Sequence, residues 1–422
     1  MPTPRPTQRP IQIDSEIGRL RKVIVHSPGP EIENVTPASA AEALYDDILY
    51  LPLAQEEHRH FTAVLETVAQ VFELTELLET VLADPGVAEA LLGRLCELYH
   101  CQDRLPELLQ IPPAILAHQL IEGTPMRKDS LTKFLSPLRF DLPPLPNAFF
   151  MRDATMCVND RVVIGSMANR VREAEALLLR AIFSHHPEFR ESPFYFDGTD
   201  RSAPNVTIEG GDLLVIRPDL VVLGFGERTS PQAIDVLLQA FAQAGRIRDV
   251  IVVEIPRSRA TIHLDMIFTM IDVDKCVVFP PLITGEQKCR AIHVAFEEGR
   301  IRSLESRPDL LTALAELGVR LEPIPCGGQN PLYQEREQWT SGANFFAIAP
   351  GKIIGYERNP ATFAELERHG YPTIQARDVM AGRVDLADYP RCAIMMPGAE
   401  LSRGGGGCRC MTLPVWREPV AL

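Results

Sequence analysis

Four short polar segments lie beside apolar runs, and their residue types could together carry out chemistry on a small cation. The first three are FMRDAT (150–155), IEGGD (208–212) and HLD (263–265), and the fourth is the glycine-rich RGGGGCRCM (403–411). Each of the first three adjoins a pair of apolar runs that reads as two strands and a turn. We therefore expect their side chains at strand ends, where functional sites commonly lie.

Cys410 is the candidate nucleophile. It follows four consecutive glycines, Gly404–Gly407, whose backbone can approach a ligand closely because glycine has no Cβ. The positive charge of Arg409 could favour a thiolate on Cys410. Two alternatives stay open: Cys408 is a rival nucleophile, and the whole segment could be a flexible linker.

His263 and Asp265 are two residues apart, so on a strand they would share one face. His263 could be a core histidine with satisfied hydrogen bonds, or a metal ligand together with Asp265 and Glu209. It could also be the acid/base partner of a cysteine nucleophile. Glu209 precedes Gly210 and Gly211, which allow tight backbone packing but are equally compatible with a bulge and a surface glutamate.

Three acidic residues, Asp153, Glu209 and Asp265, accompany the histidine and the cysteine. Singly, each would be interpreted as a solvated charge. Collectively they suit a planar cation, because a guanidinium presents five N–H donors in one plane that carboxylates can accept. The sequence therefore predicts a pocket for a guanidinium group.

The elements that must position these residues form a recurring pattern of two apolar runs joined by turn residues. The predicted hairpins span Thr155–Gly165, Asp212–Gly224, Ile267–Phe279 and Asn344–Tyr356, and predicted helices at Arg170–Ile182, Pro231–Ala244 and Ala361–Arg368 follow three of them. A repeated strand–hairpin–helix unit indicates internal repeats around an axis. The alternative is a plain α/β sheet with accidental similarity between its parts.

The N-terminal third has a different character. Residues 21–29 read as a strand, and apolar residues at helical spacing run from Phe61 to Val81. Further helices are predicted at 87–92, 95–99 and 114–121, with prolines between them. We interpret about 40–135 as a mostly helical insert, and the Pro-rich, polar start of the chain as a flexible arm over 1–15.

Composition excludes some classes of function. The 422-residue chain is 45% hydrophobic and 23% charged, with a net charge of −14 and no block of basic residues. This argues against a nucleic-acid partner, and the short apolar runs argue against a membrane partner. Nine cysteines without a CxxC pair indicate reduced thiols in the cytoplasm and argue against a structural zinc site.

Taken together, the segments resemble those of the arginine deiminases, in the guanidino-group-modifying (pentein) superfamily. The resemblance runs almost end to end and includes LYDDILYL (44–51), GFGERTS (224–230) and REQWTSGANFFAIAPGKIIGYERN (336–359). It implies a fivefold pseudosymmetric α/β propeller of ββαβ units, with the helical insert, in one catalytic domain over 16–422.

The resemblance also implies residue roles. Cys410 falls on the nucleophile, His263 on the acid/base, Glu209 on the partner of the histidine, and Asp153 and Asp265 on the carboxylates that grip the guanidinium. The amino-acid end of the substrate would be held by Asn147, Arg172, Arg228 and Arg403. The sequence departs from the family at Gly405, where the usual R-G-R-G-G has its second arginine.

The implied reaction is hydrolysis of L-arginine to L-citrulline and ammonia through an S-alkylthiouronium intermediate on cysteine, with no metal or organic cofactor. One alternative is a related guanidine hydrolase or dihydrolase with another substrate or product. An alternative from another class is a catalytically silent arginine-binding protein. We further expect a homo-oligomer.

Overall fold

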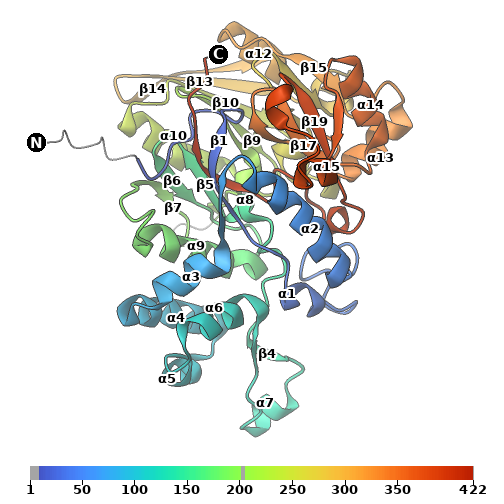
Figure 1. Ribbon diagram of the computed structural model, residues 1–422. Coiled ribbons are helices and arrows are strands. Elements are labelled where there is room, and N and C mark those ends of the chain that lie inside the picture. The colour runs from blue at the N-terminus through green and yellow to red at the C-terminus, as the bar shows by residue number, and fades with distance from the viewer. Residues whose placement is uncertain (1–8, 201–204, 422) are drawn as a thin grey trace, which may run out of the picture.

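The computed structural model describes residues 9–200 and 205–421 and has a mixed α/β fold (Figure 1). Within these residues, five sheets share one topology: an antiparallel pair of strands, one of which also pairs in parallel with a third strand. Helices lie around the sheets. Parallel neighbours need a long crossover connection. At least one helix therefore lies between the two parallel strands of each pair in the sequence.

The first two of these sheets follow the FMRDAT and IEGGD segments. One contains β5 (Thr155–Val158), β6 (Arg161–Ile164) and β7 (Phe194–Asp197), and α9 (Glu173–His185) connects its last two strands. The other contains β8 (Leu213–Arg217), β9 (Leu220–Phe225), β10 (Asp249–Glu254), β13 (Ala291–Glu297) and β14 (Arg300–Arg307), with α10 (Pro231–Ala244) after β9. Both predicted hairpins are confirmed.

The next two sheets confirm the remaining predicted hairpins. One contains β11 (Phe268–Met270), β12 (Lys275–Val278) and β15 (Glu322–Pro325), with α11 (Pro280–Ile283) and α12 (Leu310–Glu316) between the last two. The other contains β16 (Phe346–Ala349), β17 (Lys352–Tyr356), β18 (Thr373–Gln375) and β19 (Cys392–Met396). In the sequence, α13 (Pro331–Trp339) precedes β16, α14 (Pro360–Arg368) follows β17, and α15 (Ala376–Met380) lies between β18 and β19.

The fifth sheet joins segments from opposite ends of the sequence. In it, β1 (Leu20–Val25) pairs antiparallel with β20 (Leu413–Arg417) and parallel with β2 (Gln70–Glu73). Gln12 extends this contact through an isolated bridge to Trp416, whereas Ile13, whose side chain is buried, forms a bridge to Asn159 between β5 and β6. Residues 11–15 therefore pack into the fold instead of belonging to a flexible arm; residues 1–8 of the predicted arm lie outside the described residues.

The N-terminal third contains α1 (Pro30–Glu33), α2 (Leu51–Glu66), α3 (Leu74–Leu82), α4 (Pro85–Tyr99), α5 (Leu105–Leu108), α6 (Pro113–Glu122) and α7 (Leu131–Leu135), with the small pair β3 (Thr124–Pro125) and β4 (Phe140–Leu142). In Figure 1, α3–α7 lie together below the sheets. The helical pattern predicted continuously over 61–81 is wrong at its centre, where β2 separates α2 from α3. The edge of β1 supplies hydrogen-bond partners there, and this pairing overrides the local periodicity.

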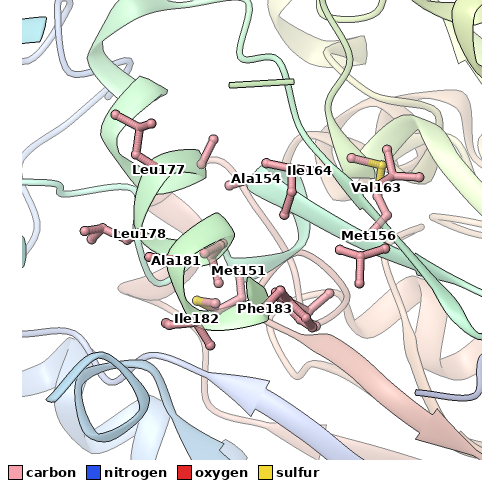
Figure 2. Close-up of a cluster of buried hydrophobic side chains, with 14 of the residues drawn as sticks. Met151, Ala154, Met156, Val163, Ile164, Leu177, Leu178, Ala181, Ile182 and Phe183 are labelled. Atoms are coloured by element: carbon pink, nitrogen blue, oxygen red, sulfur yellow. The ribbon is translucent and has the colours of Figure 1, made fainter. Parts of the chain in front are cut away.

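Apolar packing fixes the short helix α8 (Met151–Ala154), which carries the FMRDAT aspartate. In Figure 2, Met151 and Ala154 lie among side chains of α9 and the β5–β6 hairpin, including Ile182 and Phe183. Full burial of such a side chain contributes about 1.5–3 kcal/mol. Asp153, which lies between Met151 and Ala154 in the sequence, is thereby held on a rigid turn. Among the described residues, no helix has both the length and the apolar character needed to cross a bilayer.

Candidate active site

Segments far apart in the sequence meet around one small cavity of about 20 Å³. Its lining includes Asp153 from α8, His263 from the HLD segment and Cys410 from the glycine-rich segment. The other lining residues are Leu44, Asn147, Phe150, Arg172, Arg228, Arg259, Ile262 and Gly404–Gly406. Three of the five predicted catalytic residues thus line one cavity. The other two contact these lining residues: Glu209 contacts His263, and Asp265 contacts Cys410.

The HLD segment is a turn, so its prediction as part of a strand is wrong. His263 is extended, Leu264–Met266 forms a 3₁₀ turn, and β11 begins only at Phe268. The buried carboxylate of Asp212 accepts the Leu264 N–H at 2.9 Å and the Thr229 hydroxyl at 2.6 Å. Asp212, the last residue of IEGGD, therefore joins the two segments that carry Glu209 and His263.

The glycine pair of IEGGD is required by close approach. A Cβ on Gly211 would lie 2.5 Å from His263 Nδ1, and one on Gly210 would lie 2.0 Å from the carbonyl oxygen of Arg152. Both distances are shorter than van der Waals contact allows. The two glycines therefore let this backbone pass directly beneath the imidazole and against α8.

Glu209 and His263 form a buried ion pair. Glu209 Oε2 lies 2.9 Å from His263 Nε2 and accepts a hydrogen bond from Arg228 Nη1 at 3.3 Å. Burial opposes charge on Glu209, but His263 and Arg228 outweigh it and lower its pKa to about 2. Burial likewise opposes the imidazolium, but Asp153 and Glu209 raise the pKa of His263 to about 9. At neutral pH, His263 is therefore protonated.

Asp153 and Asp265 each use one carboxylate oxygen within the protein. Asp153 Oδ2 accepts from Arg172 Nη1 at 2.5 Å, and Asp265 Oδ2 accepts from Arg409 Nη1 at 2.7 Å. The second oxygen of each, Oδ1, is buried and has no hydrogen-bond partner among the described residues. A buried carboxylate oxygen without a donor is costly. Both oxygens can accept a cationic N–H donor, and Asp153 Oδ1 also lies 3.7 Å from His263 Nδ1.

The Cys410 sulfur lies 3.9 Å from Asp265 Oδ2. Burial, and then the negative charges of Asp265 and Asp153, raise the pKa of this thiol well above its usual range. Arg409 lowers the pKa of the thiol, as expected, but burial and the two aspartates outweigh it, because the Arg409 guanidinium is directed to Asp265 and Glu16. A cation placed between the two aspartates would reverse the electrostatic balance at the sulfur.

The rival cysteine lies elsewhere. Cys408 is buried, does not line the cavity, and its sulfur lies 3.3 Å from that of Met396. Of the two cysteines, Cys410 lines the cavity and Cys408 does not.

The residues expected to hold the amino-acid end of a substrate are divided. Asn147, Arg172 and Arg228 line the cavity of Cys410. Arg403 lines a neighbouring cavity of about 190 Å³ and bonds Asp47 at 2.6 Å. Arg403 is therefore not brought together with the others.

Sequence reasoning missed two residues that hold the cysteine segment. Asn344 Oδ1 accepts the backbone N–H groups of Arg409 and Cys410 at 3.0 and 3.3 Å, and its Nδ2 donates to the carbonyl of Asp265 at 3.1 Å. Glu16 accepts from Arg409 Nε at 2.9 Å. Asn344 lies in the segment 336–359, and the resemblance of this segment to the family could have pointed to it. No feature of the sequence around Glu16 indicates its role.

Asp153, Glu209 and His263 form a group whose ligand atoms lie within 4.8 Å of one another, the geometry of a possible metal site. However, Glu209 already accepts from Arg228 and His263, and Asp153 from Arg172. A divalent ion would lie among these cations and would have to displace the Glu209–His263 bond. The donor set therefore fits a metal poorly, and it fits a planar organic cation well.

Comparisons with known proteins agree with this geometry. The family model described as "Arginine deiminase" matches residues 41–417. A protein of Oenococcus oeni named arginine deiminase is 33% identical over 433 residues, covering 97% of this chain and 98% of the relative. One of Limosilactobacillus reuteri with the same name is 34% identical, covering 98% and 99%.

Among solved structures, the amidinotransferase SxtG of Microseira wollei superposes with a TM-score of 0.55 at 13% identity, covering 97% of this chain and 98% of that one. This similarity shows that the two proteins share a mixed α/β fold. The sequence matches are more specific. The chain belongs to the arginine deiminase family.

Proposed function

We propose that this protein hydrolyses L-arginine to L-citrulline and ammonia, with Cys410 as the nucleophile. The observation that carries the proposal is the pair of buried Oδ1 atoms of Asp153 and Asp265, which accept no hydrogen bond from the described residues and belong to the cluster around the Cys410 thiol. A guanidinium supplies the planar N–H donors that these oxygens lack. Membership of the arginine deiminase family supports the same substrate.

Substrate binding prepares both reactants. The two aspartates orient the guanidinium and keep it charged, so its central carbon stays electrophilic. The substrate cation offsets the negative charges that raise the pKa of Cys410, and this favours release of the thiol proton. The enzyme then holds a thiolate, an imidazolium on His263 and an activated carbon.

The first half-reaction forms a bond between the Cys410 sulfur and the guanidinium carbon. As one C–N bond breaks, His263 gives its proton to the departing nitrogen, which leaves as ammonia. The product is a thiouronium on Cys410 and a neutral imidazole. Glu209 stabilises the imidazolium before this transfer and keeps the ring oriented afterwards.

The second half-reaction uses water. Neutral His263 takes a proton from water, the hydroxide attacks the thiouronium carbon, and the C–S bond breaks to release citrulline. The imidazolium and thiolate are restored, and the remaining proton is taken up by ammonia. Two steps thus replace one difficult attack of water on a resonance-stabilised cation.

The architecture that supports this chemistry is proposed to be a fivefold pseudosymmetric α/β propeller. Five sheets with the same topology, an antiparallel pair plus one parallel strand, support it. In this proposal, residues 16–422 form one catalytic domain, with the helical segment of about 40–135 inserted into it. We further propose a cytoplasmic homo-oligomer without a nucleic-acid or membrane partner.

Mass spectrometry of products from arginine labelled in the guanidino group tests the function. Equal amounts of citrulline and labelled ammonia support it, and an adduct on Cys410 after acid quench supports the covalent step. Ornithine as the main product would indicate a dihydrolase. Tight arginine binding without any product would indicate a silent binding protein.

A further inference from the structure

A second cavity, of about 410 Å³, lies apart from the cavity of Cys410. Its lining comes from the segment that follows β1, from the end of β2 and from α1, α2, α3 and α6, and the two cavities have no lining residue in common. Cavities of this size hold small organic molecules in proteins. The proposed reaction uses none of these residues, so the function of this cavity has to be sought in its own chemistry.

The lining of the second cavity is acidic. Among the described residues that form it there is no lysine or arginine, and its titratable side chains are Glu31, Glu73, Glu76, Glu79, Glu122, His26 and His118. The glutamates come from four different elements, so the negative charge is spread around the cavity. A hollow lined by charge of one sign concentrates ions of the opposite sign, here cations.

His26 lies between two of these carboxylates. Its Nε2 is 3.3 Å from Glu31 Oε1, and its Nδ1 is 2.9 Å from Glu73 Oε1. Burial opposes charge on the imidazole, but Glu31 and Glu73 raise the pKa of His26 to about 10. At neutral pH one imidazolium therefore serves two glutamates, and the lining keeps a net negative charge.

Glu31 has an acceptor that the protein leaves without a donor. Its two donors, His26 Nε2 and the backbone N–H of Gly29, both bond Oε1, the second at 2.6 Å. The other oxygen, Oε2, is buried and accepts no hydrogen bond from the described residues, and Glu31 is only 1% exposed. A buried carboxylate oxygen without a donor is costly. A ligand in the cavity that Glu31 lines can supply this donor.

The spacing of the acidic groups favours an extended organic cation over a metal ion. Within the part of the chain that the structure describes, the group of histidine and acidic ligand atoms that lie within 4.8 Å of one another is at the reaction centre, and this cavity holds no such group. A compact ion could therefore not be surrounded here. A flexible chain with several ammonium groups can reach separate carboxylates, because each ammonium carries three N–H donors.

We propose that this cavity binds an aliphatic polyamine, with one ammonium group bonded to Glu31 Oε2 and another beside the exposed glutamates of α3, Glu76 and Glu79. The site is separate from the proposed reaction and does not depend on it. A polyamine bound there would join α1, α3 and α6. Because the site is assembled only in the folded chain, binding would also stabilise the protein against unfolding.

Calorimetric titration of the full chain with spermidine tests the proposal, at physiological ionic strength so that exposed charges are screened. The main variant is Glu31→Gln. Its control is Glu33→Gln, which removes the same charge from an exposed residue of α1 that does not line the cavity. Glu79→Gln is a second variant at an exposed lining position, where folding is not at risk. Propylamine, with a single ammonium group, is the comparison ligand.

Glu31→Gln should weaken spermidine binding roughly ten- to hundredfold, as expected for loss of a charge-assisted hydrogen bond. Glu79→Gln should weaken it about two- to fivefold, because its carboxylate is exposed. Glu33→Gln should leave it unchanged, and propylamine should bind more weakly than spermidine.

Equal effects of Glu31→Gln and Glu33→Gln would overturn the proposal, as would wild-type protein that binds no spermidine or binds propylamine equally well. Loss of spermidine binding in excess magnesium chloride would show attraction to surface charge only, and would also overturn it. Circular dichroism checks the fold of each variant. If Glu31→Gln does not fold, unchanged binding by Glu79→Gln contradicts the proposal.

Discussion

Glu209 Oε2 lies 2.9 Å from His263 Nε2, and the same oxygen lies 3.3 Å from Arg228 Nη1. One carboxylate oxygen thus joins the acid/base histidine to a structural cation, with water excluded from all three side chains. The pair fixes both the orientation and the protonation of the imidazole. The proposed chemistry depends on this relationship because His263 must begin each cycle as an acid.

Glu209→Gln should move the titration of His263 to lower pH. The pKa of this histidine is raised to about 9, so the imidazolium is present below that value and is lost as pH rises through it. Removing the negative charge of Glu209 removes one cause of the increase. NMR titration of the imidazole, with the alkaline limb of kcat/KM, checks the shift. Unchanged titration would show that Glu209 does not control the proton.

Cys410→Ser should abolish turnover and leave the fold intact, because a serine hydroxyl is far less nucleophilic than a thiolate. Cys408→Ser is the matched control. It should retain most activity and lose some stability, since Cys408 packs in a buried apolar cluster. Steady-state citrulline formation and thermal unfolding separate the two effects. An active Cys410→Ser protein would disprove the assignment of the nucleophile.

Asp265→Asn should lower kcat/KM for arginine roughly ten- to hundredfold, as expected for loss of a hydrogen bond to a charged group worth about 1.5–3 kcal/mol. The amide also brings N–H donors beside Arg409, which currently bonds Asp265 Oδ2 at 2.7 Å. Kinetics with arginine measure the loss, and circular dichroism checks the fold. Near-normal kinetics would mean that the HLD aspartate serves structure only.

Gly211→Ala should reduce kcat more than it reduces stability, because the new methyl would meet the His263 ring at 2.5 Å and displace it. Gly93→Ala is the control: this residue lies inside α4, where an added Cβ has nothing within 4 Å. That change should raise stability by up to about 1 kcal/mol through helix propensity and leave activity unchanged. Normal kcat in Gly211→Ala would contradict the close-packing argument.

Exhaustive chelation should leave the rate of citrulline formation unchanged, since a thiolate and an imidazole perform every proposed step. The group of Asp153, Glu209 and His263 makes the experiment necessary, because its ligand atoms lie within 4.8 Å of one another. Metal analysis of the same samples before and after chelation is the control. A rate that falls on chelation and returns with zinc or manganese would contradict the covalent mechanism.

Sequence patterns were sufficient for the segments that carry chemistry and for the four hairpins beside them, because each is encoded locally by turn residues, glycines and alternating apolar residues. They failed where a distant segment decides the outcome. Residues 70–73 retain helical periodicity, yet form β2 because β1 offers a free edge. The HLD segment forms a turn because Asp212, more than fifty positions away, accepts its backbone N–H at 2.9 Å.

The same reason explains the residues that sequence reasoning missed. Asn344 looks like an ordinary polar residue before a strand, and its role depends on backbone groups of Arg409 and Cys410. Glu16 looks like an ordinary charged residue near the start of the chain. Its bond to Arg409 exists only after these two remote segments have met.

The pairing of β1 with β20 imposes an order on biosynthesis. Cys410 lies shortly before β20, which is translated long after its partner strand β1. The sheets between them can fold as they emerge, but β1 must wait for its antiparallel neighbour until β20 has been translated. The proposed nucleophile therefore joins Asp153, Glu209 and His263 after the rest of the site, and a product truncated before Cys410 would lack both the thiol and the strand that pairs with β1.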